Sequence, residues 1–321
     1  MKNLSKKLLS VSLAAAAAFS LAACSTEVAE SSFDNPLPWH SAVQSYEKLS
    51  YAVAVYNTQK SEKEDEREKI ADGTMTFTLE EGKEDGTTML VTDFSVTYSD
   101  TELAGEDRGL TDTITSTVYF EPNSLTVSSM QKTVLLADRE GSDNLSYIIT
   151  ADYFGTHKAT FKYIKQNTKE KTMSLPRDAV RDNEMMFFVA RAQKIGKGSS
   201  TNFKMINLFD TFNYGETTEY TIAVTGGAER SIDIGDWVKG FGIAADKDDS
   251  AKYPVKCITT TLAINAENHG PSYTVKYALD SFKQGDEEHK KIPLAIDYST
   301  FSGSNPYRHI SYTLSDCTFK K

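Results

Sequence analysis

The chain has 321 residues and carries 45 Asp and Glu against 35 Lys and Arg, a formal net charge of −10. This acidic balance excludes proteins that hold nucleic acid on a basic surface, and it opposes electrostatic docking on anionic lipid. Phe and Tyr number 16 each, and aromatic residues favour β-strands. The length suits one large β domain or two smaller ones.

The first 23 residues have the pattern of an export signal. Lys2, Lys6 and Lys7 supply positive charge, and an apolar stretch interrupted by small serines follows over residues 8–23. That stretch is shorter than the roughly 20 apolar residues that span a bilayer comfortably. A basic start, a short apolar core and small residues at its end are typical of a secretory signal. We therefore expect residues 1–23 to be a signal peptide.

The end of this segment, Leu21-Ala22-Ala23-Cys24, resembles the lipobox of bacterial lipoproteins. The resemblance implies that a peptidase cuts before Cys24 and that its thiol carries a diacylglyceryl group, with fatty acyl chains such as palmitate. Two acyl chains, at about 0.8 kcal/mol per buried CH₂, anchor a protein stably. Removing the signal takes away three lysines and no acids, so the net charge becomes about −13. We expect an extracytoplasmic protein attached through lipid to the cell membrane, or to the outer membrane in a Gram-negative envelope. A plain secretory signal and an uncleaved anchor are the alternatives.

The remainder divides into a lipidated tether at 24–38 and a single large antiparallel β domain at 39–321, and a division into two lobes near 176–200 stays open. Apolar and polar residues alternate in many short runs, and period-two alternation predicts strands with one buried and one solvated face. Turn-forming clusters separate successive runs, which favours hairpins and meanders. The apolar positions of the earlier runs include Leu49, Tyr51, Val53, Val55, Met75, Phe77, Leu79, Phe94, Val96, Tyr98, Ile114, Val118 and Phe120.

One segment, residues 182–193, departs from the alternation. Asp182 or Asn183 suits the cap of a helix, and Met185, Phe188 and Val189 share one helical face. This pattern predicts a helix packed against the sheet. Alternation resumes after it, and the last sixty residues predict a four-stranded meander.

The order of elements resembles a group of uncharacterised bacterial envelope proteins that share the curved half-barrel of lipoprotein carriers and receptors. The matching residues are N-E-M-M-F-F-V-A-R at 183–191, Y-P-V-K-C-I at 253–258 and K-I-P-L-A-I at 291–296. The resemblance covers about the last 140 residues. It implies a mainly β fold, a curved antiparallel sheet in the form of a half-barrel or open barrel, and an apolar concavity. It carries over no catalytic residue.

The sequence lacks the strong signatures of catalysis. Its five histidines are scattered, and neither H-E-x-x-H nor C-x-x-C is present, so we expect no metal site. Residues 240–245 match G-x-G-x-x-A, but no βαβ pattern surrounds them, which indicates a turn and not a dinucleotide site. A G-x-S-x-G elbow is also absent. We expect no catalytic residue and no cofactor.

Two cysteines remain after Cys24, and an exported protein can pair them. A bridge between Cys257 and Cys317 would close a loop of about 60 residues and stabilise the fold by roughly 4 kcal/mol in the chain-entropy model. Two unpaired small side chains are the alternative.

Binding is the function class that this pattern favours. A curved sheet can hold lipid or another apolar ligand on its concave face, and Tyr273, Val275, Tyr277 and Leu279 are the candidate lining residues. Ordinary core positions are their alternative. The expected function is a membrane-anchored, non-enzymatic lipoprotein. A protein-interaction module that holds another envelope protein is the second hypothesis, and a hydrolase is the third.

Overall fold

The computed structural model describes residues 46–57, 67–82, 86–138, 145–167, 169–177, 181–243, 253–265, 272–302 and 305–320. Within these ranges, fourteen strands form one sheet whose order does not close on itself, and neighbouring strands in it are antiparallel. The expected signal peptide, Cys24 and the tether lie outside the described residues.

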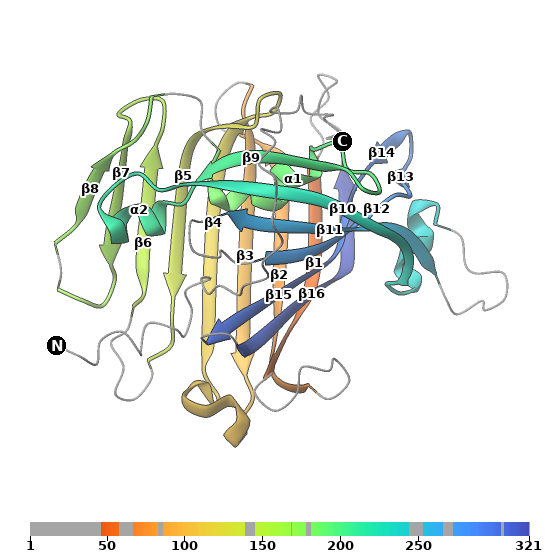
Figure 1. Ribbon diagram of the computed structural model, residues 1–321, viewed down its shortest axis with the longest axis horizontal. Coiled ribbons are helices and arrows are strands. Elements are labelled where there is room, and N and C mark those ends of the chain that lie inside the picture. Colours follow the sequence, from red (N-terminus) through yellow and green to blue (C-terminus); the bar gives the residue numbers. More distant parts are fainter. Residues whose placement is uncertain are drawn as a thin grey trace.

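The first half of the sheet is a meander of eight successive strands, with the 3-10 helix η4 (Glu102–Asp107) between the third and fourth (Figure 1). The strands are β1 (Tyr46–Asn57), β2 (Glu68–Glu81), β3 (Thr88–Tyr98), β4 (Thr111–Glu121), β5 (Thr126–Leu135), β6 (Tyr147–Asp152), β7 (Lys158–Tyr163) and β8 (Lys171–Ser174).

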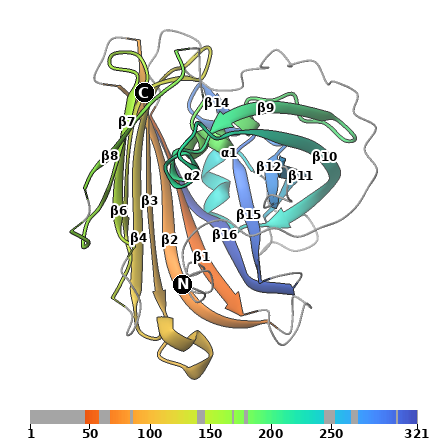
Figure 2. The ribbon, with the colours of Figure 1, turned by 60° about the vertical axis from the view of Figure 1, so that its left-hand side comes forward.

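The second half curls away from the first and encloses the concave side (Figure 2). Its order from the middle of the sheet to the far edge is β16-β15-β12-β11-β10-β9. The 3-10 helix η6 (Asp236–Phe241) and a separate hairpin of β13 (Phe282–Gln284) and β14 (Glu287–His289) are inserted between these strands. The strands are β9 (Ser200–Ile206), β10 (Glu219–Asp233), β11 (Pro254–Asn265), β12 (Ser272–Ala278), β15 (Pro293–Ser302) and β16 (Asn305–Lys320).

The two ends of the described chain meet in the middle of the sheet, because β1 pairs with β16. The register places Tyr51 opposite Leu314 and Val53 opposite Tyr312, and all four side chains are buried. The alternating apolar residues therefore pack into a large core that spans both halves and into a small second cluster that includes Val55, Val96 and Tyr98.

The segment between β8 and β9 crosses from one edge of the sheet to the other. It carries the 3-10 helix η5 (Asn183–Met185) and α1 (Met186–Arg191) along the concave side, and α2 (Leu208–Tyr214) follows β9 (Figure 2). Asp182 caps η5, because its carboxylate accepts the amide of Glu184 at 3.0 Å. Ring contacts of Phe188 with Phe77 and of Phe187 with Tyr273 fix α1 between β2 and β12.

The prediction of a mainly β fold with a curved, open antiparallel sheet and a packed helix near 182–193 is confirmed. The helix is shorter than predicted and begins as a 3-10 turn. The closing four-stranded meander is present as β11, β12, β15 and β16. The structure adds α2, which the sequence analysis did not predict.

Candidate ligand-binding groove

An open groove of about 190 Å³ lies on the concave face. An apolar cavity of about 150 Å³ is large enough to bind benzene, so this groove has room for an aromatic ring or a short stretch of acyl chain. Its wall is largely apolar and comes from the middle strands of the sheet and from the crossing segment. The lining residues are Val55, Met75, Phe77, Thr92, Phe94, Val96, Tyr98, Asp112, Ile114, Lys132, Asn183, Glu184, Met186, Phe187, Tyr273, Tyr298, Arg308, Ile310 and Tyr312.

Seven of the 19 residues that line the groove are aromatic. The Phe94 and Tyr312 rings lie 6.3 Å apart across the sheet, and Tyr273 stacks on Tyr298 at 4.7 Å between centroids. Such aromatic pairs contribute stabilisation in addition to that from the apolar area that they bury. Phe94, Phe187 and Ile310 are only half-buried, so an apolar ligand would cover them.

The helix α1 covers one part of the concave face and forms a side wall of the groove. Its Phe188 and Val189 are fully packed in the core, whereas Phe187 turns to the groove. The phenol of Tyr277 donates to the carbonyl of Phe187 at 3.1 Å, which holds the helix against β12. The concave face is thus partly filled by the helix and partly open.

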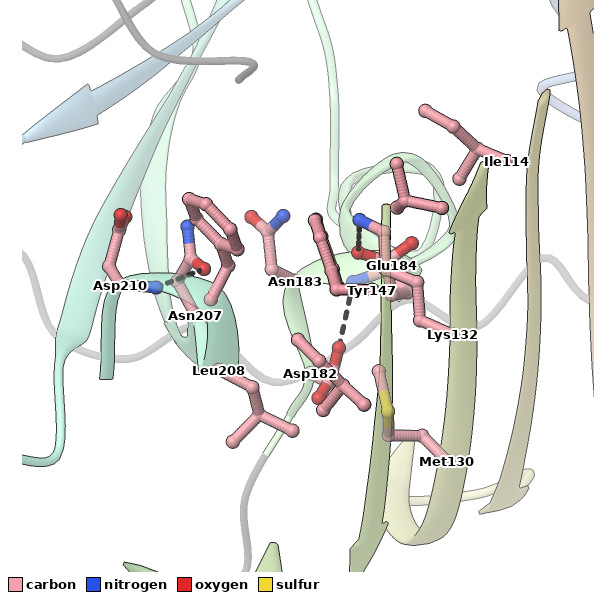
Figure 3. Close-up of a pocket in the computed structure, with 13 residues that line it drawn as sticks. Ile114, Met130, Lys132, Tyr147, Asp182, Asn183, Glu184, Asn207, Leu208 and Asp210 are labelled. Carbon is pink, nitrogen blue, oxygen red and sulfur yellow. Dashed lines mark hydrogen bonds and ion pairs between the residues drawn. The ribbon is translucent and has the colours of Figure 1, made fainter. Parts of the chain in front are cut away.

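A polar cluster lies at one end of the groove. Lys132 of β5 pairs with Glu184 of η5 at 2.6 Å, and both residues also line a second, smaller cavity of about 60 Å³ (Figure 3). Asp182, Asn207 and Asp210 line that small cavity as well. Groove and cavity adjoin, because Lys132 and Glu184 belong to both.

The protonation states in this cluster follow from its burial. Burial, and next the negative charge of Glu184, raise the pKa of Asp182 to about 6, although the Tyr153 hydroxyl donates to its carboxylate at 2.5 Å. Burial also raises the pKa of Asp210, against a hydrogen bond from Tyr220. Burial alone would lower the pKa of Lys132, but the charge of Glu184, the Tyr147 phenol and the hydrogen bond to Glu184 together outweigh it and raise that pKa, so Lys132 remains an ammonium.

The opposite end of the groove holds a second ion pair. The guanidinium of Arg308 pairs with Asp107 and donates to the Tyr98 hydroxyl at 3.2 Å. The carboxylate of Asp112 lies nearby in the lining and accepts the amide of Ala137 at 3.0 Å. The charge of Arg308 at this end is therefore already compensated by Asp107.

Of the four predicted lining residues, the structure places only Tyr273 on the groove. Val275 and Tyr277 are wholly buried core residues of β12, and Tyr277 lies beneath α1. Leu279 follows the end of β12 and is 44% exposed. The prediction was wrong for Tyr277 because α1 covers it, for Val275 because it is buried in the core, and for Leu279 because β12 ends at Ala278.

The possible disulfide between Cys257 and Cys317 is not formed, and the alternative of two unpaired side chains holds. Cys257 and Cys317 are both free and buried, and the strands β12 and β15 separate their strands in the sheet. Three strand spacings amount to about 14 Å, which exceeds the roughly 7 Å that a disulfide allows between Cα atoms.

Other expectations bear less on the site. Residues 240–243 lie at the end of η6, where Gly242 adopts a left-handed conformation. Among the described ranges there is no cluster of three His, Cys, Asp or Glu suited to a metal ion. Within the same ranges, no helix has the length and apolar character needed to cross a membrane.

Comparison with known proteins shows the fold alone. No protein-family model matches the chain, and no curated protein matches its sequence. Among solved structures, it is similar to a β-barrel-like protein from Brucella abortus, a domain of unknown function (DUF1849), with a TM-score of 0.50 and 12% identity. The similarity covers 86% of this chain and 98% of that one.

Proposed function

We propose that this chain is an exported lipoprotein that binds an apolar ligand in the groove, without catalysing a reaction. The observation that supports this proposal is the open groove with aromatic walls on the concave face, about 190 Å³ in volume. Ligand sites are typically concave and mostly apolar, with a few convergent polar groups. The groove has that composition, with aromatic walls and one ion pair near each end.

The lipid anchor belongs to the same proposal and rests on the lipobox Leu21-Ala22-Ala23-Cys24. All described strands and helices lie between Tyr46 and Lys320. A chain that lacks residues 1–24 therefore keeps every described element, and an anchored domain would present its groove outside the membrane.

The direct test is ligand retention. The chain lacking residues 1–24 is purified without detergent, extracted with organic solvent and analysed by mass spectrometry. A second measurement follows the fluorescence of N-phenylnaphthylamine, an apolar probe whose emission rises when it leaves water. We expect an extracted apolar compound or saturable binding of the probe. Absence of both would sink the proposal.

Catalysis is a second candidate, because Asp182, Glu184 and Asp210 converge on the small cavity and a buried carboxyl with a raised pKa is common in active sites. Against it, both oxygens of Asp182 already accept hydrogen bonds and Glu184 is held by Lys132. Chromogenic esters and glycosides test this candidate. Turnover by the wild-type chain that Asp182→Asn abolishes would favour a hydrolase.

A further inference from the structure

The polar cluster beside the groove has an unusual composition for the end of an apolar site. Three carboxyl side chains line the small cavity, those of Asp182, Glu184 and Asp210, against the single ammonium of Lys132. Lys132 is already paired with Glu184 at 2.6 Å. An added anion would therefore meet a surplus of negative charge, whereas an added cation or hydrogen-bond donor would be attracted.

Two buried hydroxyl groups lie beside this cluster, that of Thr92 in the groove lining and that of Ser116 next to it on β4. Thr92, Ser116 and Lys132 lie opposite one another on β3, β4 and β5, so their side chains share the concave face. Ser116 is only 3% exposed, and neither its hydroxyl nor that of Thr92 has a hydrogen-bond partner among the described residues. Because buried polar groups are normally hydrogen-bonded, the hydroxyl of Thr92, which lines the groove, indicates a place for a polar group of a ligand.

The size of the small cavity restricts that group. Its volume of about 60 Å³ corresponds to about two water molecules at roughly 30 Å³ each. A primary ammonium or a hydroxymethyl group fits this space.

The geometry points to a headgroup subsite. Resting on the proposed apolar-ligand function, we infer that the groove binds an amphiphile whose apolar part contacts Phe94 and Phe187 and whose head is an amine or another small hydrogen-bond donor. The head lies at the Lys132–Glu184 end, among the carboxyl groups and the buried hydroxyls. Anionic amphiphiles are disfavoured there.

The test uses three amphiphiles with the same eight-carbon chain: octylamine, octanol and octanoic acid. Each displaces N-phenylnaphthylamine from the chain lacking residues 1–24 at pH 8, where the amine is cationic and the acid anionic. We expect octylamine to displace the probe at a concentration at least tenfold below that of octanoate, with octanol between them.

Variants locate the effect at the subsite. Glu184→Gln removes one carboxylate and leaves Lys132 without its partner, so the preference should move toward octanoate. Glu219→Gln removes an exposed carboxylate that pairs with Lys204 and should leave the preference unchanged. Retained binding of the probe shows that each variant still forms the groove.

The outcomes separate this inference from the proposed function. Equal displacement by all three compounds overturns the subsite and leaves the apolar groove standing. Strongest displacement by octanoate, lost in Arg308→Gln, overturns it in favour of an anionic head at the other end. If the probe does not bind and no apolar compound is extracted, the proposed function and the subsite both fall.

Discussion

Arg191 and Glu47 form a bidentate ion pair in the interior, with Nη1–Oε1 at 2.5 Å, Nη2–Oε2 at 3.1 Å and both side chains wholly buried. Glu47 lies near the start of β1 and Arg191 ends α1, so the pair fastens the groove-lining helix to the middle of the sheet. The His289 ring reaches the same carboxylate through Nδ1 at 3.1 Å and stacks on Phe319. The position of the groove wall thus depends on charges that water does not reach.

Removing one partner of this pair should destabilise the fold strongly. In Arg191→Met the Glu47 carboxylate stays buried without its guanidinium, and breaking a buried pair in this way costs about 3–5 kcal/mol. Urea unfolding followed by circular dichroism measures this loss. Lys69→Met is the matched control, because Lys69 pairs with Asp72 in an exposed position and such pairs contribute little. Equal losses in the two variants would contradict the account.

Asp182 should make stability depend on pH in a direction unusual for an acid. Its pKa is raised from 3.8 to about 6, so between these values the folded chain holds a proton that the unfolded chain has released. The free energy of unfolding should therefore fall as pH rises through this window, by at most about 3 kcal/mol, and level off above pH 6. Asp182→Asn removes the titrating group and should remove the decline.

The pH range of this measurement must avoid Glu47, which acts with the opposite sign. Burial alone would raise the pKa of Glu47, but the charge of Arg191 and the hydrogen bonds of His289 and Arg191 lower it from 4.5 to about 2. Its stabilisation is complete above pH 4.5 and is lost as pH falls toward 2. Urea titrations between pH 4.5 and 6.5 exclude Glu47, with Asp100→Asn as an exposed control. Burial also raises the pKa of Asp210, so the part of the decline that Asp182→Asn removes measures Asp182. An undiminished decline in Asp182→Asn would refute the assignment.

The alternation in the sequence was enough to predict a curved sheet with a concave face. It was not enough to predict which residues of that face line the groove. Phe94, Val96 and Tyr98 line the groove from a run that was predicted as a strand, as do Ile310 and Tyr312. What the alternation could not show is which concave residues stay uncovered, because that depends on the path of the segment between β8 and β9. Tyr277 has a pattern like that of Tyr273, yet α1 covers it.

The long-range ion pairs could not be predicted from the sequence, whereas the helix α2 could have been. The ion pairs Lys132–Glu184 and Arg191–Glu47 join residues 52 and 144 positions apart, a distance over which no local pattern carries information. The helix α2 was detectable, because Asn207 caps its start and Gly215, at φ 79°, ends it. An Asn and a Gly eight positions apart are typical of the two ends of a short helix, but the segment was too short to show a clear helical pattern.

Filling the groove should abolish ligand binding without unfolding the chain. Ile114 is half-buried and lines both the groove and the small cavity. In Ile114→Trp the indole occupies space that is open to a ligand, so we expect the affinity for N-phenylnaphthylamine to fall at least tenfold. Thr115→Trp adds the same ring on the opposite, exposed face of β4 and should bind the probe as before. An unchanged affinity in Ile114→Trp would show that the probe binds elsewhere.

The two cysteines should behave as protected thiols. Burial raises the pKa of Cys257 and of Cys317, and the thiolate is the form that reacts with disulfide reagents. In the chain lacking residues 1–24, which keeps only these two cysteines, we expect no rapid reaction with Ellman's reagent in the folded state. Both thiols should react once guanidinium chloride unfolds the chain. Absence of reaction after unfolding, without added reductant, would reveal a disulfide and contradict the sheet order.

The lipid anchor is tested by labelling and by exchange of the signal. Cells that express the full chain are grown with radiolabelled palmitate. The wild-type protein and Ser25→Ala should take up the label, and Cys24→Ala should not.

Replacing residues 1–24 with an ordinary cleavable secretory signal should then move the protein from the detergent phase to the aqueous phase in phase partitioning. The physical reason is that the remaining chain has a net charge of about −13, so anionic lipid repels it and the acyl chains supply its attraction to the membrane. Retention of the exchanged protein in the detergent phase would mean that a second membrane contact exists, and the concave groove, which can take an apolar chain, would be the first place to look for it.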